Sequence, residues 1–168
     1  MVRQKVYLSL GSNLGTREEN IFKAIRKIKG FLDNTRMSRL YETSPLYIED
    51  QPLFLNAVIS GFTVLSPYRL LKECQLIESS LGRERSREKK KGPRYLDIDI
   101  LLYGDKIINT GRLVLPHQGI KERQFVLIPL LELDAEVVDP VTGIPYSDYL
   151  KRLADQGVYT YKSGKYNE

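Results

Sequence analysis

The sequence contains one cysteine, one histidine and no apolar run long enough to cross a membrane. Cys74 alone cannot form an internal disulfide, and its place among apolar positions of an expected helix indicates a small buried thiol rather than a nucleophile. The apolar run from Phe125 to Pro129 is far shorter than the ~20 residues of a membrane-spanning helix. The first residues also lack the hydrophobic region of a signal peptide. These absences predict a cytoplasmic protein with no membrane partner.

The chain has 168 residues, of which 42% are hydrophobic and 28% are charged. This length is enough to bury one core and too short for two comfortable domains, so we expect a single domain over residues 1–168. Residues 156–168 are expected to form a loosely ordered tail. The formal net charge is +5, and Lys and Arg gather between Arg83 and Arg94. This excess of positive charge indicates an anionic partner without distinguishing phosphate from nucleic acid.

Periodicity in the first two thirds of the chain predicts alternating strands and helices. Thr16 is expected to cap the first helix and Ser66 the second, which has proline at its first position. The two middle strands are expected to pair antiparallel. The expected order is a strand at Lys5–Leu10, a helix from Thr16 to Gly30, strands at Met37–Thr43 and Phe54–Val64, a helix from Ser66 to Gly82, a strand at Tyr95–Tyr103 and a hairpin strand at Lys106–Ile108.

This order, βαββαβ plus a hairpin strand, predicts an α+β domain of ferredoxin-like type with a mainly antiparallel sheet and two helices on one face. The pattern weakens beyond Pro116. Gln124–Leu133 is expected to be helical in part despite Pro129, and Tyr146–Ala154 is expected to form a short helix capped by Ser147.

The sharpest local signal for chemistry is the pair Asp97 and Asp99 in the last of these strands. Alternation along a strand sends both carboxylates to one face and Leu96, Ile98 and Ile100 to the other. The carboxylates then stand about 6 to 7 Å apart. A hard divalent cation such as magnesium would remove their repulsion and leave positions for phosphate oxygens. The alternative is a solvated sheet face with harmless acidic residues, and the spacing alone does not decide between the two.

A strongly basic segment leads into that strand, with Glu84 and Glu88 as partial compensation. A metal site beside mobile cations suits phosphoryl transfer, in which the protein mainly positions oxygens and neutralises charge. The alternative is a solvated basic loop. The cations of this segment are Arg83, Arg85, Arg87, Lys89, Lys90, Lys91 and Arg94.

Other signals are weaker on their own. The glycine-rich Gly11–Gly15 lacks the lysine of a phosphate-binding loop, and a tight turn explains it. His117 follows Pro116, where a lone histidine is more often structural, although its imidazole could meet a phosphate. Gln75 and Glu78 share a helix face, which suits a ribose or base edge as well as plain solvent exposure.

Five segments of the sequence resemble the hydroxymethyldihydropterin pyrophosphokinase family, in the family's order and spacing from about Val6 to Pro140. The resemblance implies a three-layer α/β/α elaboration of the ferredoxin-like core. It also implies attack of a pterin hydroxymethyl oxygen on the β-phosphorus of ATP, with release of AMP, in folate biosynthesis. The segments are GSNLG at 11–15, DQPLFLNAV at 50–58, GPRYLDIDILLYG at 92–104, LPH at 115–117 and KERQFVLIPLLEL at 121–133.

The resemblance also implies roles for individual residues. Asp97 and Asp99 match the carboxylates that hold two magnesium ions, and Arg83 and Arg94 match arginines that clamp phosphates. The residues expected at ATP are Gln75, Glu78, Arg85, Lys91, Ile100, Arg112, His117 and Arg123. Those expected at the pterin are Thr43, Ser44, Leu46, Phe54, Asn56 and Phe125, where two aromatic faces would sandwich the flat ring while Asn56 offers a donor and an acceptor.

The chain departs from the family at a few positions. Lys91 stands where an aromatic residue is frequent, Tyr95 replaces a frequent threonine, and Phe54 and Gln118 replace tyrosines of some members. We expect residues 83–92 to act as a lid over the phosphates. We also expect a monomer that binds no nucleic acid.

Two other functions fit parts of the pattern. An RNA-binding ferredoxin-like module would share the βαββαβ order and the basic charge, but the strand that should carry its aromatic motif carries Asp97 and Asp99 instead. Nucleotide-sugar transfer through an Asp-x-Asp metal site would need a larger doubly wound domain.

Overall fold

The computed structural model describes residues 2–44, 50–82 and 93–163. Six strands form one sheet in the order β5-β1-β4-β3-β8, with β2 also paired to β4. Its pairings in the described chain are all antiparallel, as the sequence predicted. The strands are β1 (Gln4–Ser12), β2 (Asp33–Met37), β3 (Tyr41–Thr43), β4 (Phe54–Thr63), β5 (Asp97–Tyr103) and β8 (Val158–Thr160).

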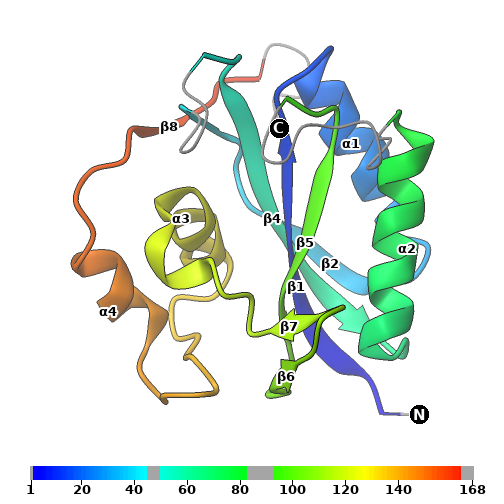
Figure 1. The fold of residues 1–168 in the computed structure, drawn as a ribbon, viewed down its shortest axis with the longest axis vertical. Helices are drawn as coiled ribbons and strands as arrows, with labels where there is room; N and C mark the ends of the chain where they lie inside the picture. Colours follow the sequence, from blue (N-terminus) through cyan, green and yellow to red (C-terminus); the bar gives the residue numbers. More distant parts are fainter. Residues whose placement is uncertain (1, 45–49, 83–92, 164–168) are drawn as a thin grey trace.

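Two helices, α1 (Arg17–Ile28) and α2 (Pro67–Ser80), cover one face of the sheet (Figure 1). Their apolar stripes meet the alternate residues Val6, Leu8 and Leu10 of β1 in the larger hydrophobic core. The stripes consist of Ile21, Ala24, Ile25 and Ile28 on α1 and of Leu70, Cys74 and Ile77 on α2.

Cys74 lies in this core and is only 1% exposed. Burial raises the pKa of its thiol to about 12, with a further contribution from the negative charge of Glu78. The prediction of a buried thiol is therefore confirmed, because a thiol with such a pKa is not a nucleophile at neutral pH.

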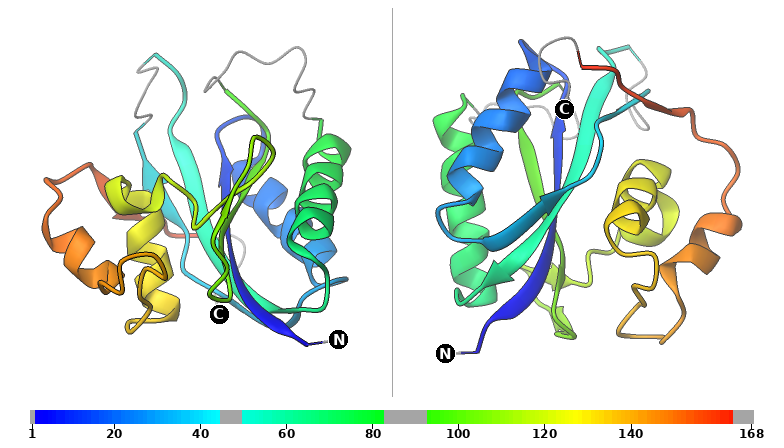
Figure 2. Two further views of the ribbon diagram at one scale, coloured as in Figure 1. Left: turned by 60° about the horizontal axis from the view of Figure 1, so that its bottom comes forward. Right: turned by 180° about the vertical axis from the view of Figure 1, so that it is seen from behind.

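The opposite face of the sheet is covered by α3 (Gln124–Leu133), against which α4 (Tyr146–Lys151) packs, and this gives three layers (Figures 1 and 2). Tyr7, Val58 and Leu102 project from the sheet into this second core, where they meet residues of α3 such as Leu127 and Leu130. The three-layer α/β/α arrangement implied by the family resemblance is confirmed, as is a helix at 124–133 that contains Pro129.

The expected strand at Met37–Thr43 is interrupted. Ser38 separates β2 from β3, and its hydroxyl accepts a hydrogen bond of 3.0 Å from the backbone N–H of Val58. The backbone N–H of Ser38 in turn donates to the carbonyl of Val58 (2.9 Å). A side chain therefore replaces a strand carbonyl at this point, and the regular ladder breaks.

The expected hairpin strand after β5 does not pair with β5. Instead β6 (Ile108–Asn109) pairs with β7 (Val114–Leu115) in a separate two-stranded sheet. The free edge of β5 is met by the segment after β7, where the backbone N–H of His117 donates to the carbonyl of Leu101 (2.9 Å). This contact brings His117 against the strand of the carboxylate pair.

Two expected helix caps are absent, and one is present. Ser66 accepts a hydrogen bond from the backbone N–H of Arg69 as predicted. Thr16 makes no side-chain cap, since its ψ of 83° is far from the extended conformation that Ser66 adopts. The helix α4 begins after Pro145, so Ser147 lies within the helix and is not its cap.

Part of the segment expected to form a loose tail from residue 156 onward is paired with the sheet, and residues 164–168 of that tail lie outside the described residues. The strand β8 adds to the edge of β3, with Thr43 opposite Val158. The backbone N–H of Tyr161 also donates to the carbonyl of Leu40 (2.8 Å). Composition did not reveal this pairing, because strand addition depends on a free sheet edge. Across the described ranges, no helix is long and apolar enough to cross a membrane.

Candidate active site

Asp97 and Asp99 lie near the start of β5, which is hydrogen-bonded to β1. Ile98 and Ile100 are buried in the core beneath α1 and α2, while the two aspartates are partly exposed. The alternation predicted from the sequence is therefore confirmed. Both carboxylates stand on the other face of the sheet.

The register of the sheet aligns these carboxylates with other expected site residues. Gly11 of β1 lies opposite Asp97 on one side and opposite Asn56 of β4 on the other. Directly opposite residues in antiparallel strands project to the same face. Since Thr43 lies opposite Phe54, two positions before Asn56, all of these side chains share one sheet face. Two strand spacings separate the backbones of Asp97 and Asn56, which is about 10 Å.

The carboxylates of Asp97 and Asp99 repel one another. The Asp99 side chain is 37% exposed toward a cavity. Even so, the protein raises the pKa of its carboxyl to about 7, first by burial and then by repulsion from Asp97 and Glu78, while Arg123 and Arg94 oppose the shift. Such a pair fits a hard divalent cation, which would relieve the repulsion. Outside residues 45–49 and 83–92 and the chain ends, no group of three or more potential metal ligands occurs. A cation held here would keep coordination positions for ligand oxygens.

Arg94 joins the carboxylates to the aromatic Phe54. Its guanidinium Nη1 lies 3.3 Å from Oδ2 of Asp97. Its Cζ lies 5.6 Å from the centre of the Phe54 ring. This strand-edge arginine is thus held between the expected metal position and the expected pterin position.

His117 approaches Asp99 from outside the sheet, with Nε2 at 3.8 Å from Oδ2 of the carboxylate. The backbone N–H of Gly119 donates to Nδ1 of the imidazole (3.0 Å). In the neutral ring Nε2 therefore carries the proton and faces the carboxylate. Burial and the nearby charge of Arg123 lower the pKa of His117, so the imidazole is a neutral donor at physiological pH. His117 therefore serves the fold through its backbone hydrogen bond to Leu101 and the candidate site through its imidazole.

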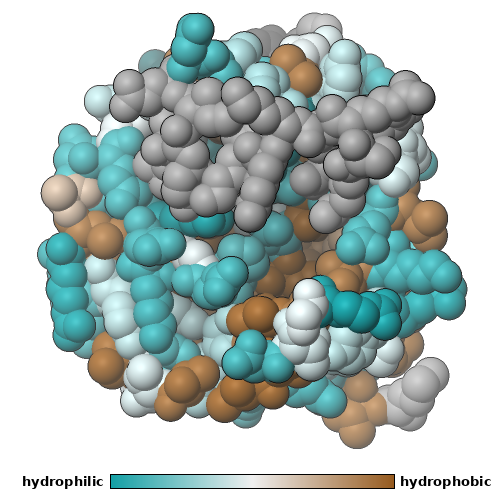
Figure 3. All heavy atoms as spheres, viewed as in Figure 1, coloured by the Kyte–Doolittle hydropathy of each residue, from teal (hydrophilic) through white to brown (hydrophobic). Residues whose placement is uncertain are grey.

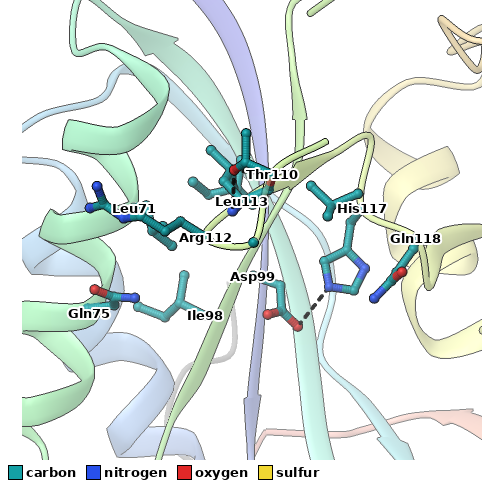
Figure 4. A pocket seen from close by; sticks show the side chains of 12 residues that line it. Leu71, Gln75, Ile98, Asp99, Thr110, Arg112, Leu113, His117 and Gln118 are labelled. Atoms are coloured by element: carbon teal, nitrogen blue, oxygen red, sulfur yellow. Dashed lines mark hydrogen bonds and ion pairs between the residues drawn. The ribbon is translucent and has the colours of Figure 1, made fainter. Parts of the chain in front are cut away.

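A cavity of about 240 Å³ opens beside these two residues (Figure 4). It lies between α2 and the turn that joins β6 to β7. Figure 3 shows a hollow on this side of the molecule with hydrophobic surface inside it. The cavity brings together Asp99 and four of the residues expected at ATP, which are Gln75, Ile100, Arg112 and His117. Sequence reasoning missed the other lining residues, Leu71, Ile98, Thr110, Gly111, Leu113, Val114 and Gln118. Of these, only Leu71 had a local signal, since it lies one helical turn before Gln75.

Two other residues expected at ATP do not line this cavity. Glu78 is 1% exposed, and its Oε1 accepts a hydrogen bond of 2.8 Å from the backbone N–H of Ile98. It therefore fixes the strand between the two aspartates from below. Arg123 lies over the ring of Phe125, with Cζ 6.0 Å from the ring centre. No sequence signal indicated the Glu78 contact, because it joins a helix to a strand 20 residues later.

The pterin residues expected on β3 and β4 lie on the shared sheet face. Asn56 is 3% exposed, and in the described structure its Nδ2 has no hydrogen-bond partner. A buried unsatisfied amide is unfavourable and indicates a site for a polar ligand. The hydroxyl of Thr43 donates to the carbonyl of Ser44 (3.2 Å). The expected residues Leu46, Arg83, Arg85 and Lys91, and the expected lid at 83–92, lie outside the described residues.

Comparison with known proteins identifies a common family. A sequence model described as 7,8-dihydro-6-hydroxymethylpterin-pyrophosphokinase (HPPK) matches residues 7–135. The folic acid synthesis protein fol1 of Pneumocystis carinii is 47% identical over 157 residues, which are 92% of this chain and 21% of that protein. The 2-amino-4-hydroxy-6-hydroxymethyldihydropteridine pyrophosphokinase of Aquifex aeolicus is 41% identical over 144 residues, which are 86% of this chain and 89% of that protein.

Solved structures share the fold. The wild-type HPPK-DHPS of Plasmodium falciparum matches with a TM-score of 0.68 at 15% identity, over 90% of this chain and 45% of that one. A second HPPK-DHPS, crystallised in complex with substrates, gives a TM-score of 0.70 at 14% identity. The chain thus spans about a fifth of the length of the fungal relative and under half of these structures.

Proposed function

The chain belongs to the 7,8-dihydro-6-hydroxymethylpterin-pyrophosphokinase family, and on this premise we propose that it pyrophosphorylates a pterin alcohol. ATP would donate its β- and γ-phosphoryl groups to the hydroxymethyl oxygen of 6-hydroxymethyl-7,8-dihydropterin. In that step the oxygen bonds to the β-phosphorus, the bond from this phosphorus to the α,β-bridging oxygen breaks, and AMP leaves while the hydroxyl proton is released. The product would serve folate biosynthesis.

One observation carries the proposal: the carboxylate pair stands between a cavity and a polar aromatic site on the same sheet. The cavity at the edge of β5 offers Gln75, Arg112 and His117 to a nucleotide. On the inner strands, Phe54 and Asn56 offer an aromatic face and an unsatisfied amide to a flat heterocycle. This arrangement suits transfer from a nucleotide to a heterocycle across Asp97 and Asp99.

Asp97 and Asp99 would hold magnesium, for which we propose two ions. Bound magnesium supplies charge neutralisation and orientation of the phosphate oxygens. Arg94 would add charge-assisted hydrogen bonds to the phosphates, and the Nε2–H of His117 would donate a neutral one. Phe54 and Phe125 would flank the pterin ring, while Asn56 would donate from Nδ2 and accept at Oδ1 along its amide edge.

The remaining expectations extend the proposal. Arg83, Arg85 and Lys91 would act on the ATP phosphates, Glu78, Ile100 and Arg123 would support the nucleotide, and Thr43, Ser44 and Leu46 would complete the pterin pocket. We further propose that the chain acts in the cytoplasm as a single-domain monomer.

The RNA-binding alternative is not favoured. RNA-recognition modules of this topology stack bases on an open sheet face. In this chain α1 and α2 cover one face, and α3, with α4 packed against it, covers the other (Figure 2).

The test is formation of AMP by the purified chain with ATP, magnesium and the dihydropterin alcohol. We expect AMP to appear only when all three are present. Release of ADP, or AMP formation that does not depend on the pterin, would contradict the proposal. A pterin that lacks the hydroxymethyl group is the matched control, since it can fill the pocket and has no oxygen to attack.

A further inference from the structure

Tyr68 extends the helical wall of the cavity outward. It is the second residue of α2, and its spacing from Leu71 and Gln75 places all three on one face of the helix. Leu71 and Gln75 line the cavity. Tyr68 is 36% exposed and does not belong to the larger hydrophobic core.

The ring and the hydroxyl of Tyr68 both contact the opposite wall. The guanidinium carbon of Arg112 lies 5.3 Å from the ring centre. The Tyr68 hydroxyl lies 3.0 Å from Oγ1 of Thr110 and shares a hydrogen bond with it. Thr110 and Arg112 both belong to the turn between β6 and β7 that lines the cavity. One side chain of α2 therefore links the helical wall to this turn.

The turn itself is held by Thr110. Its hydroxyl donates to the carbonyl of Leu113 and accepts from the backbone N–H of the same residue, both at 3.1 Å. The backbone N–H of Thr110 also donates to this carbonyl (3.0 Å). A hydrogen bond from Tyr68 to Thr110 thus acts on the residue that shapes the turn carrying Arg112.

The contact with the Tyr68 ring restricts the side chain of Arg112. This side chain extends from the turn toward α2 (Figure 4). Within residues 2–44, 50–82 and 93–163 it forms no ion pair, so the Tyr68 ring is the contact that restricts its guanidinium. A long side chain loses rotamer entropy when it binds a ligand, and prior restriction reduces that loss.

We propose that Tyr68 is a positioning residue for the nucleotide, which holds the Arg112 guanidinium at the mouth of the cavity before ATP binds. The inference rests on the proposed function, because Arg112 is expected to contact ATP. Removing the ring should weaken nucleotide binding about two- to fivefold, the fold-change of an exposed cation–π contact. Pterin binding should be unchanged, since Asn56 and Phe54 lie on strand β4, beyond β1 from this cavity.

The experiment is a double-mutant cycle measured by calorimetry with magnesium and α,β-methylene ATP. The variants are Tyr68→Leu, Arg112→Ala and the double substitution. We expect Tyr68→Leu to weaken binding in the unsubstituted background and to have almost no further effect when Arg112 is already Ala. Tyr68→Phe keeps the ring, so it should retain most of the affinity. Tyr159→Leu is the matched control, because Tyr159 is an exposed tyrosine on β8.

Melting temperature separates positioning from a purely structural role. Equal losses from Tyr68→Leu with and without Arg112, or a loss of stability without a loss of affinity, would overturn the inference. So would unchanged affinity in Tyr68→Leu while the unsubstituted protein binds normally. Failure of the unsubstituted protein to bind the analogue at all would instead overturn the proposed function, and the inference with it.

Discussion

Asn13 and Arg94 are joined by two backbone-directed hydrogen bonds that run in opposite directions. The backbone N–H of Arg94 donates to Oδ1 of Asn13 (2.8 Å), and the backbone N–H of Asn13 donates to the carbonyl of Arg94 (3.1 Å). The Asn13 amide nitrogen also donates to Gln51 Oε1 (2.9 Å) and to the carbonyl of Pro52 (3.2 Å). A side chain that is 1% exposed thus fixes both the arginine beside Asp97 and the segment that leads to Phe54.

Asn13→Ala should therefore reduce turnover and pterin affinity together. The substitution leaves the backbone N–H of Arg94 without its acceptor. Because an unsatisfied buried donor is costly, we expect the free energy of unfolding to fall by about 1–3 kcal/mol. Asn20→Ala is the matched control, because Asn20 makes two hydrogen bonds in the same loop, to Ser12 and Leu14, without touching Arg94. Chemical denaturation and pterin titration of both variants test this. Equal effects of the two substitutions on pterin affinity would contradict the role of Asn13.

Asp97→Asn and Asp99→Asn should each lower turnover by roughly 10²-fold or more while the fold persists, since such transfers depend strongly on neutralising the charge of the phosphates. The substitutions keep side-chain volume and remove the repulsion between the carboxylates, so the melting temperature should not fall. Steady-state kinetics over a range of magnesium concentrations provide the measurement, with Asp148→Asn on α4 as the control. Near-normal activity of both variants would refute the assignment.

Phe54→Ala should weaken pterin binding more than ATP binding, by about 1–3 kcal/mol on the scale of a lost stacking contact. Phe125→Ala and Asn56→Ala should act in the same direction. Phe62→Ala is a close control, because Phe62 lies on the same strand with Arg3 at 5.5 Å over its ring, much as Arg94 lies over Phe54. Calorimetry that showed ATP affinity falling while pterin affinity held would mean that the pocket is misplaced.

Gly11→Ala tests the space between the carboxylates and the pterin site, where Gly11 is buried. An added Cβ would stand 3.1 Å from Oδ1 of Asn56 and 3.8 Å from Cδ1 of Phe54. The Asn56 amide would have to shift, so we expect weaker pterin binding with little change in ATP binding. Gly111→Ala is the control for pterin binding alone, since a Cβ there meets no heavy atom within 4 Å and Gly111 lines the cavity proposed for the nucleotide. Unchanged pterin affinity in Gly11→Ala would show that the ligand does not approach this strand.

Asp139 should make the free energy of unfolding depend on pH in the acid range. Burial alone would raise the pKa of its carboxyl, but hydrogen bonds from Lys121, the backbone N–H of Val141 and the hydroxyl of Thr142 lower it overall. Because the pKa of this carboxyl is lower in the folded chain than in the unfolded chain, where it is about 3.9, the ionised group stabilises the fold. This stabilisation is fully present above pH ~3.9 and is lost as the pH falls through the folded pKa. The difference in unfolding free energy between the wild type and Asp139→Asn should therefore shrink below about pH 4. A constant difference from pH 7 to pH 3 would contradict this.

Local signals predicted the parts of the fold that depend on neighbouring residues. Alternation placed Asp97 and Asp99 on one face, and the Ser66-Pro67 pair marked the start of α2. The break at Ser38 and the pairing of β6 with β7 followed instead from contacts between distant segments, which periodicity does not report. The loop around Thr16 adopted a conformation that a capping pattern could not specify.

The residues of the candidate site also fall into those that the sequence indicated and those that only the folded structure shows. Residue chemistry indicated a metal site with nearby cations, and the family resemblance supplied the roles of Gln75, Arg112 and His117. The buried contact of Glu78 with strand β5, the connection through Asn13 and the contact of Tyr68 with Arg112 join residues 20 to 81 positions apart. Such contacts become visible only when the chain is folded.

The most direct test of the central claim follows the fate of the two terminal phosphorus atoms of ATP. The chain is incubated with magnesium, the dihydropterin alcohol and ATP labelled in separate experiments at the β- or the γ-phosphorus. We predict that both labels appear in the pterin product in equal amounts, that unlabelled AMP forms in the same quantity, and that Asp97→Asn and Asp99→Asn slow the appearance of both signals by the same factor as turnover. Transfer of the γ label alone, or no label in the pterin product, would contradict the account.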